Sequence, residues 1–328
     1  MWRTGILTRE HFLGWERAGG LEHQAPRVSL QLLDIGEGPY SDEDIHVFEG
    51  VSRLTRTSSG IYRTTYRQRL AELDAAGTRW MREIFSRDEE IVVEDRAASH
   101  GLTSAEWAES LVLVFPKLRL IASDLLLFLI EAKRGDRQLF ILEPDGTPLQ
   151  CIQPPFVLPL SSPESKRYPL NRWMVAAAAR RLSTGGEHAL RIPPEWVSSQ
   201  ERTSIHFGSW RLRKISMVHP SAREMEAHPH FRVEHGSVFD VSSVSHHLIR
   251  TMNILTLRQF PKDRLSQAVR SIHASLVEGG VWVVGRTVEE EGTVHQASIF
   301  QKRGGSFWLL EQFGSGWEAE SLALSFAN

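Results

Sequence analysis

Cysteine is almost absent from this sequence, which has 328 residues and a single cysteine, Cys151. One thiol cannot form a disulfide within the chain, and it cannot build a cysteine-based zinc or iron–sulfur site. An excess of charge of one sign is absent too, because 38 basic and 40 acidic side chains give a formal net charge of -2. A dedicated nucleic-acid-binding protein usually has a basic excess, so we expect no nucleic-acid partner.

Long apolar runs are also missing. The most apolar stretch, residues 110–132, contains Lys117, Arg119, Asp124 and Glu131, and four charges in practice exclude a transmembrane helix there. Residues 1–20 mix charged and apolar side chains and lack the apolar core of a signal peptide. We therefore expect a cytoplasmic protein without a membrane partner.

Several short motifs that are typical of catalytic or nucleotide-binding sites are absent as well. The chain has no G-x-S-x-G, no P-loop and no G-x-G-x-x-G. Among its 14 histidines, His228, His230 and His235 lie close together in sequence, but no H-x-x-x-H pair with a helical carboxylate accompanies them. We expect these histidines to be solvated or packed, and we expect no metal.

What the sequence does contain is an alternation of short apolar runs and amphipathic stretches. Residues 90–94 and 118–122 predict buried strands, with helices over about 103–114 and 125–134. After an interruption, strands are predicted at 231–235, 247–252 and 281–285. An amphipathic helix is predicted over 264–276, and Gly279-Gly280 is expected to end it. The segments 296–302 and 307–313 flank R-G-G-S and predict a final antiparallel hairpin.

This order predicts an α/β fold, with a Rossmann-like seven-stranded, mostly parallel sheet and an antiparallel final hairpin. Residues 86–135 and 216–328 are expected to form that domain. Residues 1–85 are expected to form an N-terminal helical or lid region. Residues 136–215, which are rich in proline and turns, are expected to be an inserted subdomain that shapes a substrate pocket.

The loop after the first predicted strand, VVEDRAASHG at residues 92–101, is the first candidate site. In a nucleotide-binding α/β fold this loop must approach the ligand closely, and the helix after it offers an electropositive N-terminus. The small residues Ala97, Ala98, Ser99 and Gly101 permit such an approach. A tight turn without a ligand is an equally good interpretation, because the loop has only one glycine.

Two further strand ends carry candidate ligand contacts. Asp124, which precedes Leu125, can accept two hydrogen bonds from a ribose diol, although it can also cap the predicted helix that follows. In the run HGSVFD, Ser237 can bond an adenine, and Val238 or Phe239 can pack against it. An ordinary loop with a buried phenylalanine is the alternative for that run.

The stretch from His246 to Thr287, together with the preceding VHPSAR…HFRVEHGSVFD, resembles class I S-adenosylmethionine-dependent methyltransferases, in particular the chemotaxis receptor methyltransferase branch. The resemblance covers roughly residues 85–135 and 215–313. It implies S-adenosylmethionine as the cofactor. The cofactor contacts that it implies, together with the neighbouring Leu125, are Asp95, Ala97, Ser99, Gly101, Asp124, Ser237, Val238, Phe239, Thr251, Met252 and Asn253.

The resemblance also assigns individual roles, from which the sequence departs in places. Asp95 takes the acidic position at the end of the first strand, and Ala97, Ser99 and Gly101 take three glycine positions. Two of those three are therefore not glycine. Arg96 directly follows Asp95, and we expect the two side chains to pair.

These features lead to a methyltransferase that acts on a small-molecule acceptor by O- or N-methylation, with a homodimer as the candidate assembly. His100, His247 and Asn253 are the candidate catalytic residues, and Tyr62, Tyr66 and Tyr168 can reach the site from a lid or insertion. The eroded loop favours an alternative, a cofactor-binding pseudoenzyme or partner subunit. Protein carboxyl methylation is a second alternative, and a nicotinamide-dependent oxidoreductase is disfavoured because G-x-G-x-x-G is missing.

Overall fold

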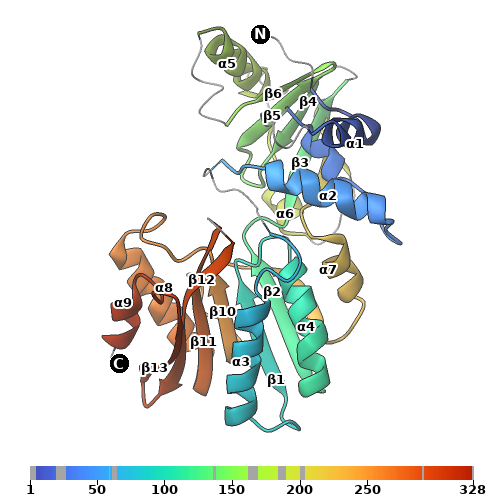
Figure 1. The fold of residues 1–328 in the computed structure, drawn as a ribbon. Helices are drawn as coiled ribbons and strands as arrows, with labels where there is room; N and C mark the ends of the chain where they lie inside the picture. Colours follow the sequence, from blue (N-terminus) through green and yellow to red (C-terminus); the bar gives the residue numbers. More distant parts are fainter. Residues whose placement is uncertain are drawn as a thin grey trace. The chain divides into compact units, whose positions relative to one another are not determined.

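The computed structural model describes residues 5–19, 27–58, 60, 65–135, 138–161, 169–183, 190–199, 204–289 and 292–326 (Figure 1). The chain divides into two compact units, each made of two stretches of sequence. One unit contains Met1–Thr64 and Leu126–Pro220, and the other contains Thr65–Leu125 and Ser221–Asn328. These boundaries differ from the predicted ones, because the N-terminal region 1–85 is shared between the units and the inserted stretch begins at residue 126 instead of 136.

The first unit contains a six-stranded antiparallel sheet. Its strands lie in the order β6-β5-β4-β3-β8-β7. Their bounds are β3 (Phe128–Arg134), β4 (Gln138–Leu142), β5 (Pro148–Gln153), β6 (Phe156–Pro159), β7 (Ile205–Phe207) and β8 (Trp210–Ser216). The helices of this unit are α1 (Arg9–Arg17), the 3-10 helix η2 (Leu30–Leu33), α2 (Asp42–Leu54), α5 (Pro169–Ser183) and α6 (Pro194–Ser198).

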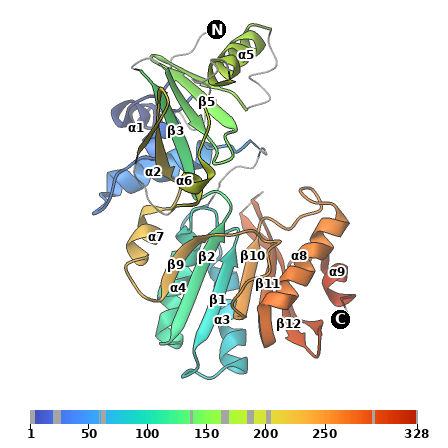
Figure 2. The same ribbon diagram turned by 180° about the vertical axis from the view of Figure 1, so that it is seen from behind.

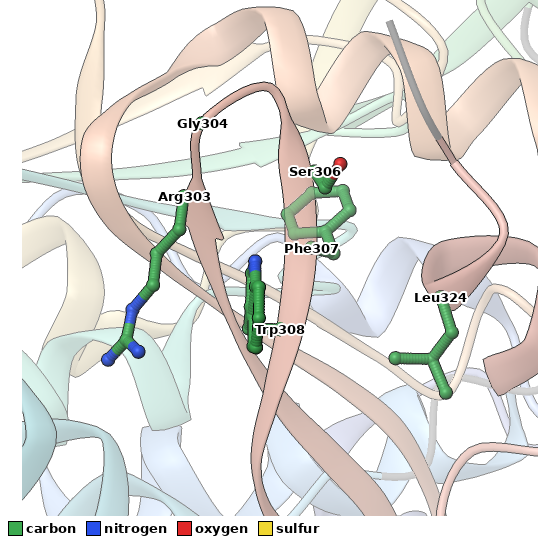
Figure 3. Close-up of a pocket in the computed structure, with 6 residues that line it drawn as sticks. All are labelled: Arg303, Gly304, Ser306, Phe307, Trp308 and Leu324. Atoms are coloured by element: carbon green, nitrogen blue, oxygen red, sulfur yellow. The ribbon is translucent and has the colours of Figure 1, made fainter.

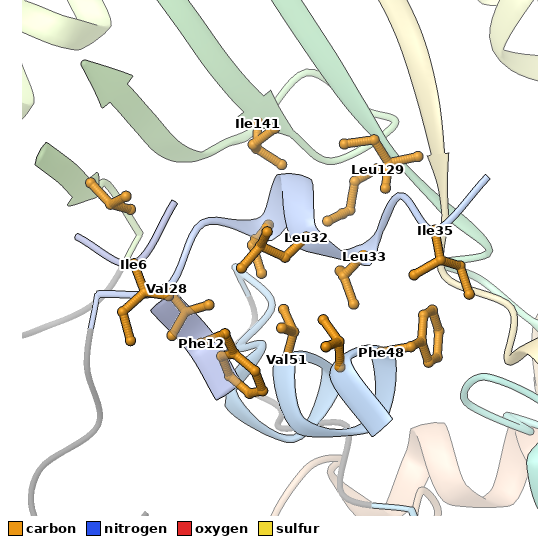
Figure 4. Close-up of a cluster of buried hydrophobic side chains, with 14 of the residues drawn as sticks. Ile6, Phe12, Val28, Leu32, Leu33, Ile35, Phe48, Val51, Leu129 and Ile141 are labelled. Atoms are coloured by element: carbon orange, nitrogen blue, oxygen red, sulfur yellow. The ribbon is translucent and has the colours of Figure 1, made fainter. Parts of the chain in front are cut away.

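Each face of this sheet has its own hydrophobic core. One core combines strand residues with η2, α1 and α2, and Figure 4 shows Leu33, Phe48 and Leu129 meeting there. The other core contains Ile130 and Phe140 together with residues of α5 and α6. Successive side chains of a strand point to opposite faces, which is why Leu129 and Ile130 belong to different cores.

The predicted helix over residues 125–134 is wrong, because β3 occupies most of that segment. β3 pairs with β4 on one side and with β8 on the other. Its apolar residues Leu129, Ile130 and Ala132 are buried, and Glu131 is held by Arg213 of β8 at 3.0 Å. Pairing with strands distant in sequence therefore outweighs the local helical preference of this short apolar run.

The second unit contains the predicted seven-stranded sheet. Its strand order is β13-β12-β11-β10-β1-β2-β9. Strands β9, β2, β1, β10 and β11 are parallel, whereas β12 is antiparallel to β11 and β13. Their bounds are β1 (Ile91–Arg96), β2 (Leu118–Asp124), β9 (Phe231–His235), β10 (His246–Met252), β11 (Leu276–Glu289), β12 (Thr293–Arg303) and β13 (Ser306–Phe313). The predicted fold class, a Rossmann-like sheet with an antiparallel final hairpin, is confirmed.

Helices cover both faces of this sheet. They are α3 (Ala71–Ile84), α4 (Leu102–Val114), α7 (Pro220–Met225), α8 (Lys262–Ser275) and α9 (Glu320–Leu324). Figures 1 and 2 show α3 and α4 on one face and α8 on the other. The helix predicted over about 103–114 is confirmed as α4, and its N-cap is Gly101.

The amphipathic helix predicted over residues 264–276 is confirmed as α8, but the predicted role of Gly279-Gly280 in ending it is wrong. α8 ends at Ser275, and Gly279-Gly280 lies inside the long strand β11. A Cβ on Gly280 would lie 2.8 Å from the Val277 carbonyl oxygen, so this glycine permits a close backbone approach. Within the part of the chain that is described, no helix has the length and apolar character needed to cross a membrane.

Candidate functional site

The strand order places a topological switch point between β1 and β10. From β1 the chain adds β2 and β9 on one side, and it then returns to place β10 and β11 on the other side. Ligands of open α/β sheets bind outside the carboxyl ends of the strands at such a point. The loops that follow β1, β2, β9 and β10 therefore define the candidate site.

The loop after β1 has an unusual backbone. Ala97, Ser99 and Gly101 all have positive φ angles, of 60°, 61° and 80°. This left-handed region suits glycine and is costly for residues that carry a Cβ. These are the three positions that the resemblance assigns to glycine, so the loop keeps a glycine-type conformation although two of the glycines are replaced.

Asp124 lies at the carboxyl end of β2, beside that loop. Its Oδ2 accepts a hydrogen bond from the Ser99 N–H at 2.9 Å. The side chain is partly exposed, and the neighbouring Leu125 is 60% exposed. The alternative role of Asp124 as a helix cap is wrong, because β3 and not a helix follows it. A carboxylate is thus fixed against the backbone of the candidate ligand loop.

Asp95, at the end of β1, is enclosed instead of open to a ligand. It is 3% exposed and forms a two-point ion pair with Arg250, its register partner on β10. Arg250 Nε donates to Asp95 Oδ1 at 3.0 Å, and the Ser104 hydroxyl donates to Asp95 Oδ2. Asp74 of α3 binds the same guanidinium. The structure therefore commits Asp95 to the interior.

The charges of this cluster are unequal, because one guanidinium faces two carboxylates. Burial opposes the charge of Arg250, but Asp74 and Asp95 outweigh it, and the pKa of Arg250 is raised. Burial raises the pKa of Asp74 to about 7, although Arg250 acts in the opposite direction. The guanidinium also lies 4.5 Å from the centre of the Trp107 ring. At neutral pH Asp74 is thus close to its titration midpoint.

The predicted pairing of Arg96 with Asp95 is wrong. Consecutive residues of a strand point to opposite faces, so Arg96 shares its face with Glu94. Arg96 Nε donates to Glu94 Oε2 at 2.8 Å, and the Ser123 hydroxyl donates to Glu94 Oε1 at 2.9 Å. β1 therefore carries one buried ion pair on each face of the sheet.

Arg96 also connects β1 to the loop that follows β9. Its Nη1 donates to the Asp240 carbonyl oxygen at 2.9 Å and to the Ser271 hydroxyl of α8 at 3.3 Å. Within that loop the Ser237 hydroxyl accepts a hydrogen bond from the Phe239 N–H at 3.2 Å. This bonding fixes the loop, which carries the residues predicted to contact adenine.

The other side chains of the loop are partly committed to packing. Val238 is buried in the core beneath α8. Phe239 is partly buried and packs edge-on against Phe260, with the Arg264 guanidinium 4.1 Å from its ring centre. Phe239 is therefore better placed than Val238 to meet a ligand.

The end of β10 contributes fewer residues to the candidate site than the sequence predicted. Thr251 and Met252 are buried, and the Thr251 hydroxyl accepts a hydrogen bond from the Trp282 indole N–H at 2.9 Å. Asn253 follows the strand with a φ of 63°, and its Oδ1 accepts a hydrogen bond from the Thr287 N–H at 2.7 Å. Of these three, only Asn253 lies beyond the end of its strand. It is at the carboxyl ends of the parallel strands, as the β1 loop is.

The two histidines proposed as catalytic lie at different places. His100 is in the β1 loop and is buried. His247 lies at the start of β10, where its Nδ1 accepts a hydrogen bond from the Val92 N–H at 3.1 Å and its Nε2 lies 3.3 Å from Glu89. Asn253 is six positions further along the chain, at about 3.3 Å per position. His247 therefore lies at the wrong end of the sheet for a role at the site.

Of the three tyrosines that were expected to reach the site, Tyr66 lies among the described residues and bonds a residue of β12. The Tyr66 hydroxyl bonds the Thr293 hydroxyl at 2.6 Å. Tyr62 and Tyr168 lie outside the described residues. Among the residues that are described, no group of histidine, cysteine, aspartate or glutamate could hold a metal ion.

Three residues of this cluster were not expected from the sequence, namely Arg250, Asp74 and Ser104. A signal for Arg250 was present, because a charged residue inside the apolar strand HHLIRTM needs a buried partner. Asp74 lies on α3 and Ser104 on α4, and nothing in their local sequence marks them. Only the fold brings these three residues to the end of β1.

A pocket of about 580 Å³ lies at another place, around the β12–β13 turn. Figure 3 shows its lining residues, which are Arg303, Gly304, Ser306, Phe307, Trp308 and Leu324. The register pairs Gln301 with Val281 near the start of the parallel part of β11, whereas Gly285 pairs with Met252 at the end of β10. This pocket therefore lies near the amino-terminal ends of the parallel strands, whereas the β1 loop lies at their carboxyl ends.

Comparison with known proteins gives distant structural similarities only. No family model matches the chain, and no curated protein matches it. The sugar N-methyltransferase KedS8 from Streptoalloteichus sp ATCC 53650 is similar at 14% identity and a TM-score of 0.28, over 76% of each chain. The amino pentose methyltransferase CalS10 from Micromonospora echinaspora is similar at 13% identity and 0.30, over 85% of this chain and 83% of that one. The CMeT domain of the citrinin polyketide synthase is similar at 11% identity and 0.35, over 86% and 52%.

Proposed function

We propose that this protein binds S-adenosylmethionine at the carboxyl ends of β1 and β2 and transfers its methyl group to a small molecule. The observation that carries the proposal is the loop after β1, in which Ala97, Ser99 and Gly101 hold left-handed conformations at the switch point of the sheet. A loop of this kind leads into the N-terminus of a helix, which is where a nucleoside ligand is bound in folds of this type.

The residues of the site fit the nucleoside part of this cofactor. Asp124 is partly exposed at the end of β2, where a carboxylate can accept hydrogen bonds from a ribose diol. Phe239 offers a partly buried aromatic face on the loop after β9, which Arg96 holds in place. Asp95 does not fit the contact that the resemblance implies, because Arg250 and Ser104 occupy its carboxylate.

S-adenosylmethionine, when bound, supplies a methyl group that its positive sulfur already activates. The protein then has to orient donor and acceptor and to exclude water. A general base is needed for an ammonium or alcohol acceptor. His100 is the proposed base, because it is in the β1 loop, whereas His247 lies at the other end of the sheet.

An assay for S-adenosylhomocysteine tests the proposed activity. The protein is incubated with S-adenosylmethionine and fractions of a small-molecule extract, and the product is measured by mass spectrometry. We expect S-adenosylhomocysteine to form only when an acceptor fraction is present, and we expect Asp124→Ala to form none. If S-adenosylmethionine binds but no fraction supports turnover, the methyl-transfer half of the proposal is wrong.

That outcome would support a second candidate function, a cofactor-binding protein without methyl transfer. The ion pair between Asp95 and Arg250 favours this alternative, because it removes an acidic side chain from the candidate site. The two candidates share the binding site and differ only in turnover. The assay therefore separates them.

A further inference from the structure

The outer edge of the seven-stranded sheet is formed by β13, whose first half is apolar. In the strand SFWLLEQF, Trp308 is 58% exposed and Leu309 is 38% exposed. Its one charged residue, Glu311, is held by Arg79 and by the Trp80 indole N–H of α3. The segment Ser306–Leu310 thus has neither a charge nor a proline, which are the usual protections of an edge strand.

The opposite edge of the same sheet is protected. β9 has only five residues, and its exposed side chains are Arg232, Glu234 and His235. Its Val233 N–H donates to the Glu226 carboxylate at 3.2 Å, so a side chain satisfies part of the edge. The contrast marks β13 as the edge that is built to be covered.

Residues of this unprotected edge line the pocket near the β12–β13 turn. Phe307 points into the core under α8, and Trp308 points to the other face of the sheet. Leu324 of α9 completes the wall on the side of Phe307 (Figure 3). Among the described residues, no side chain bonds the backbone of Ser306–Leu310, so its outward N–H and C=O groups are available to another strand.

We infer that Ser306–Leu310 of β13 pairs antiparallel with the same segment of a second copy of this chain, so that one sheet continues through both molecules. A two-fold axis makes such an interface self-complementary. The charges at the ends of the segment agree with this arrangement, because Arg303 precedes it and Glu311 follows it. Antiparallel pairing places the basic end of one copy beside the acidic end of the other.

The interface is small, and this sets the expected affinity. Pairing five residues on each side, together with the exposed Trp308 and Leu324, buries less surface than the roughly 1,200–2,000 Å² of a stable complex. The bulge at Leu310, which leaves that residue outside the register between Ile299 and Phe300, limits further pairing. We expect a dimer that dissociates in the micromolar range.

Sedimentation equilibrium of the full chain tests this inference. The wild type should change from the monomer mass toward twice that mass as its concentration rises from about 1 to about 100 µM, and Leu309→Lys should remain monomeric. Leu113→Lys, on α4 and 76% exposed in the wild type, is the matched control and should dimerise normally. A wild type that stays monomeric, or a Leu309→Lys variant that still dimerises, overturns the inference.

Hydrogen exchange supplies a second measurement that needs no variant. The outward-facing backbone amides of Ser306–Leu310 should be protected in the concentrated wild type and should lose that protection on dilution, whereas the amides that face β12 should not change. Protection that stays the same over a range in which the mass changes would place the interface elsewhere and contradict pairing through β13. The inference does not depend on the proposed methyl transfer.

Discussion

Arg250 on β10 forms a two-point ion pair with Asp95, the residue opposite it on the parallel strand β1. The pair is buried at the end of the two central strands and is shared with Asp74 of α3. Removing one member of a buried pair leaves an uncompensated charge, whereas removing both can be nearly neutral. Each member of the pair is therefore needed for stability as long as the other is present.

Arg250→Met should lower the free energy of unfolding by about 3–5 kcal/mol, because both carboxylates lose their buried cation. Urea unfolding at pH 7 measures this loss. Adding Asp95→Asn to the variant should recover part of it. Arg119→Met, at an exposed position on the neighbouring strand β2, should change stability by less than about 0.5 kcal/mol. Equal losses at the two arginines would contradict the role of the pair.

Asp74 should make the stability depend on pH. Its pKa is raised from 3.8 to about 7 by burial, so the folded state binds a proton more tightly than the unfolded state does. The contribution is fully present below pH 3.8 and is lost as the pH rises through about 7. Between pH 5 and pH 8 the wild type should lose on the order of 2 kcal/mol of stability through this group.

Asp74→Asn should remove that loss, since an amide does not titrate. The measurement is urea unfolding of both proteins at pH 5 and pH 8, with the exposed Asp88→Asn as the control. Relative to the wild type, the free energy of unfolding of Asp74→Asn should be higher at pH 8 than it is at pH 5. A difference that is the same at both values would show that Asp74 does not titrate in this range.

The β1 loop should be stabilised by restoring glycine. A left-handed conformation costs a residue with a Cβ about 1–2 kcal/mol, and glycine's greater freedom in the unfolded chain offsets about 0.5–1 kcal/mol of that. Ala97→Gly and Ser99→Gly should each raise the free energy of unfolding by about 0.5–1 kcal/mol. Ala98→Gly, between them and outside the left-handed region, should lower it instead. Thermal unfolding of the three variants gives the comparison, and destabilisation by all three would refute the account of the loop.

Arg96 should control the order of the loop after β9. Arg96→Met removes the hydrogen bonds to Glu94, Ser271 and the Asp240 carbonyl, so the amides of Phe239 and Asp240 should exchange faster with solvent. Arg264→Met removes only a contact with the Phe239 ring and should leave those amides nearly unchanged. Faster exchange in both variants, or in neither, would argue against this role of Arg96.

The central strands of the second unit were predictable because β1, β2 and the middle of β11 are short apolar runs between turn residues. The segment 125–134 was not, since β3 depends on pairing with β4 and β8, which lie elsewhere in the sequence. The three loop positions at 97, 99 and 101 could be located from the resemblance. The partner of Asp95 could not, because Arg250 is 155 residues away and only the parallel register brings them together.

Two wrong predictions about side-chain position could have been avoided from the sequence alone. Arg96 was expected to bind Asp95, although neighbours in a strand point to opposite faces, and that rule was available from the sequence. The error at His247 could also have been avoided from the sequence, because this residue opens the strand predicted at 247–252. Ligands of parallel sheets bind at the carboxyl ends of the strands, which is the other end.

Isothermal titration calorimetry with S-adenosylmethionine and S-adenosylhomocysteine tests the central claim most directly. Binding should be in the micromolar range, should weaken at least about tenfold in Asp124→Ala, and should be unchanged in Asp145→Ala, at an exposed turn of the other unit. Thermal unfolding of each variant confirms that it is folded. If neither ligand binds the wild type at millimolar concentration, the site at the ends of β1 and β2 does not hold this cofactor, and the proposed function is wrong.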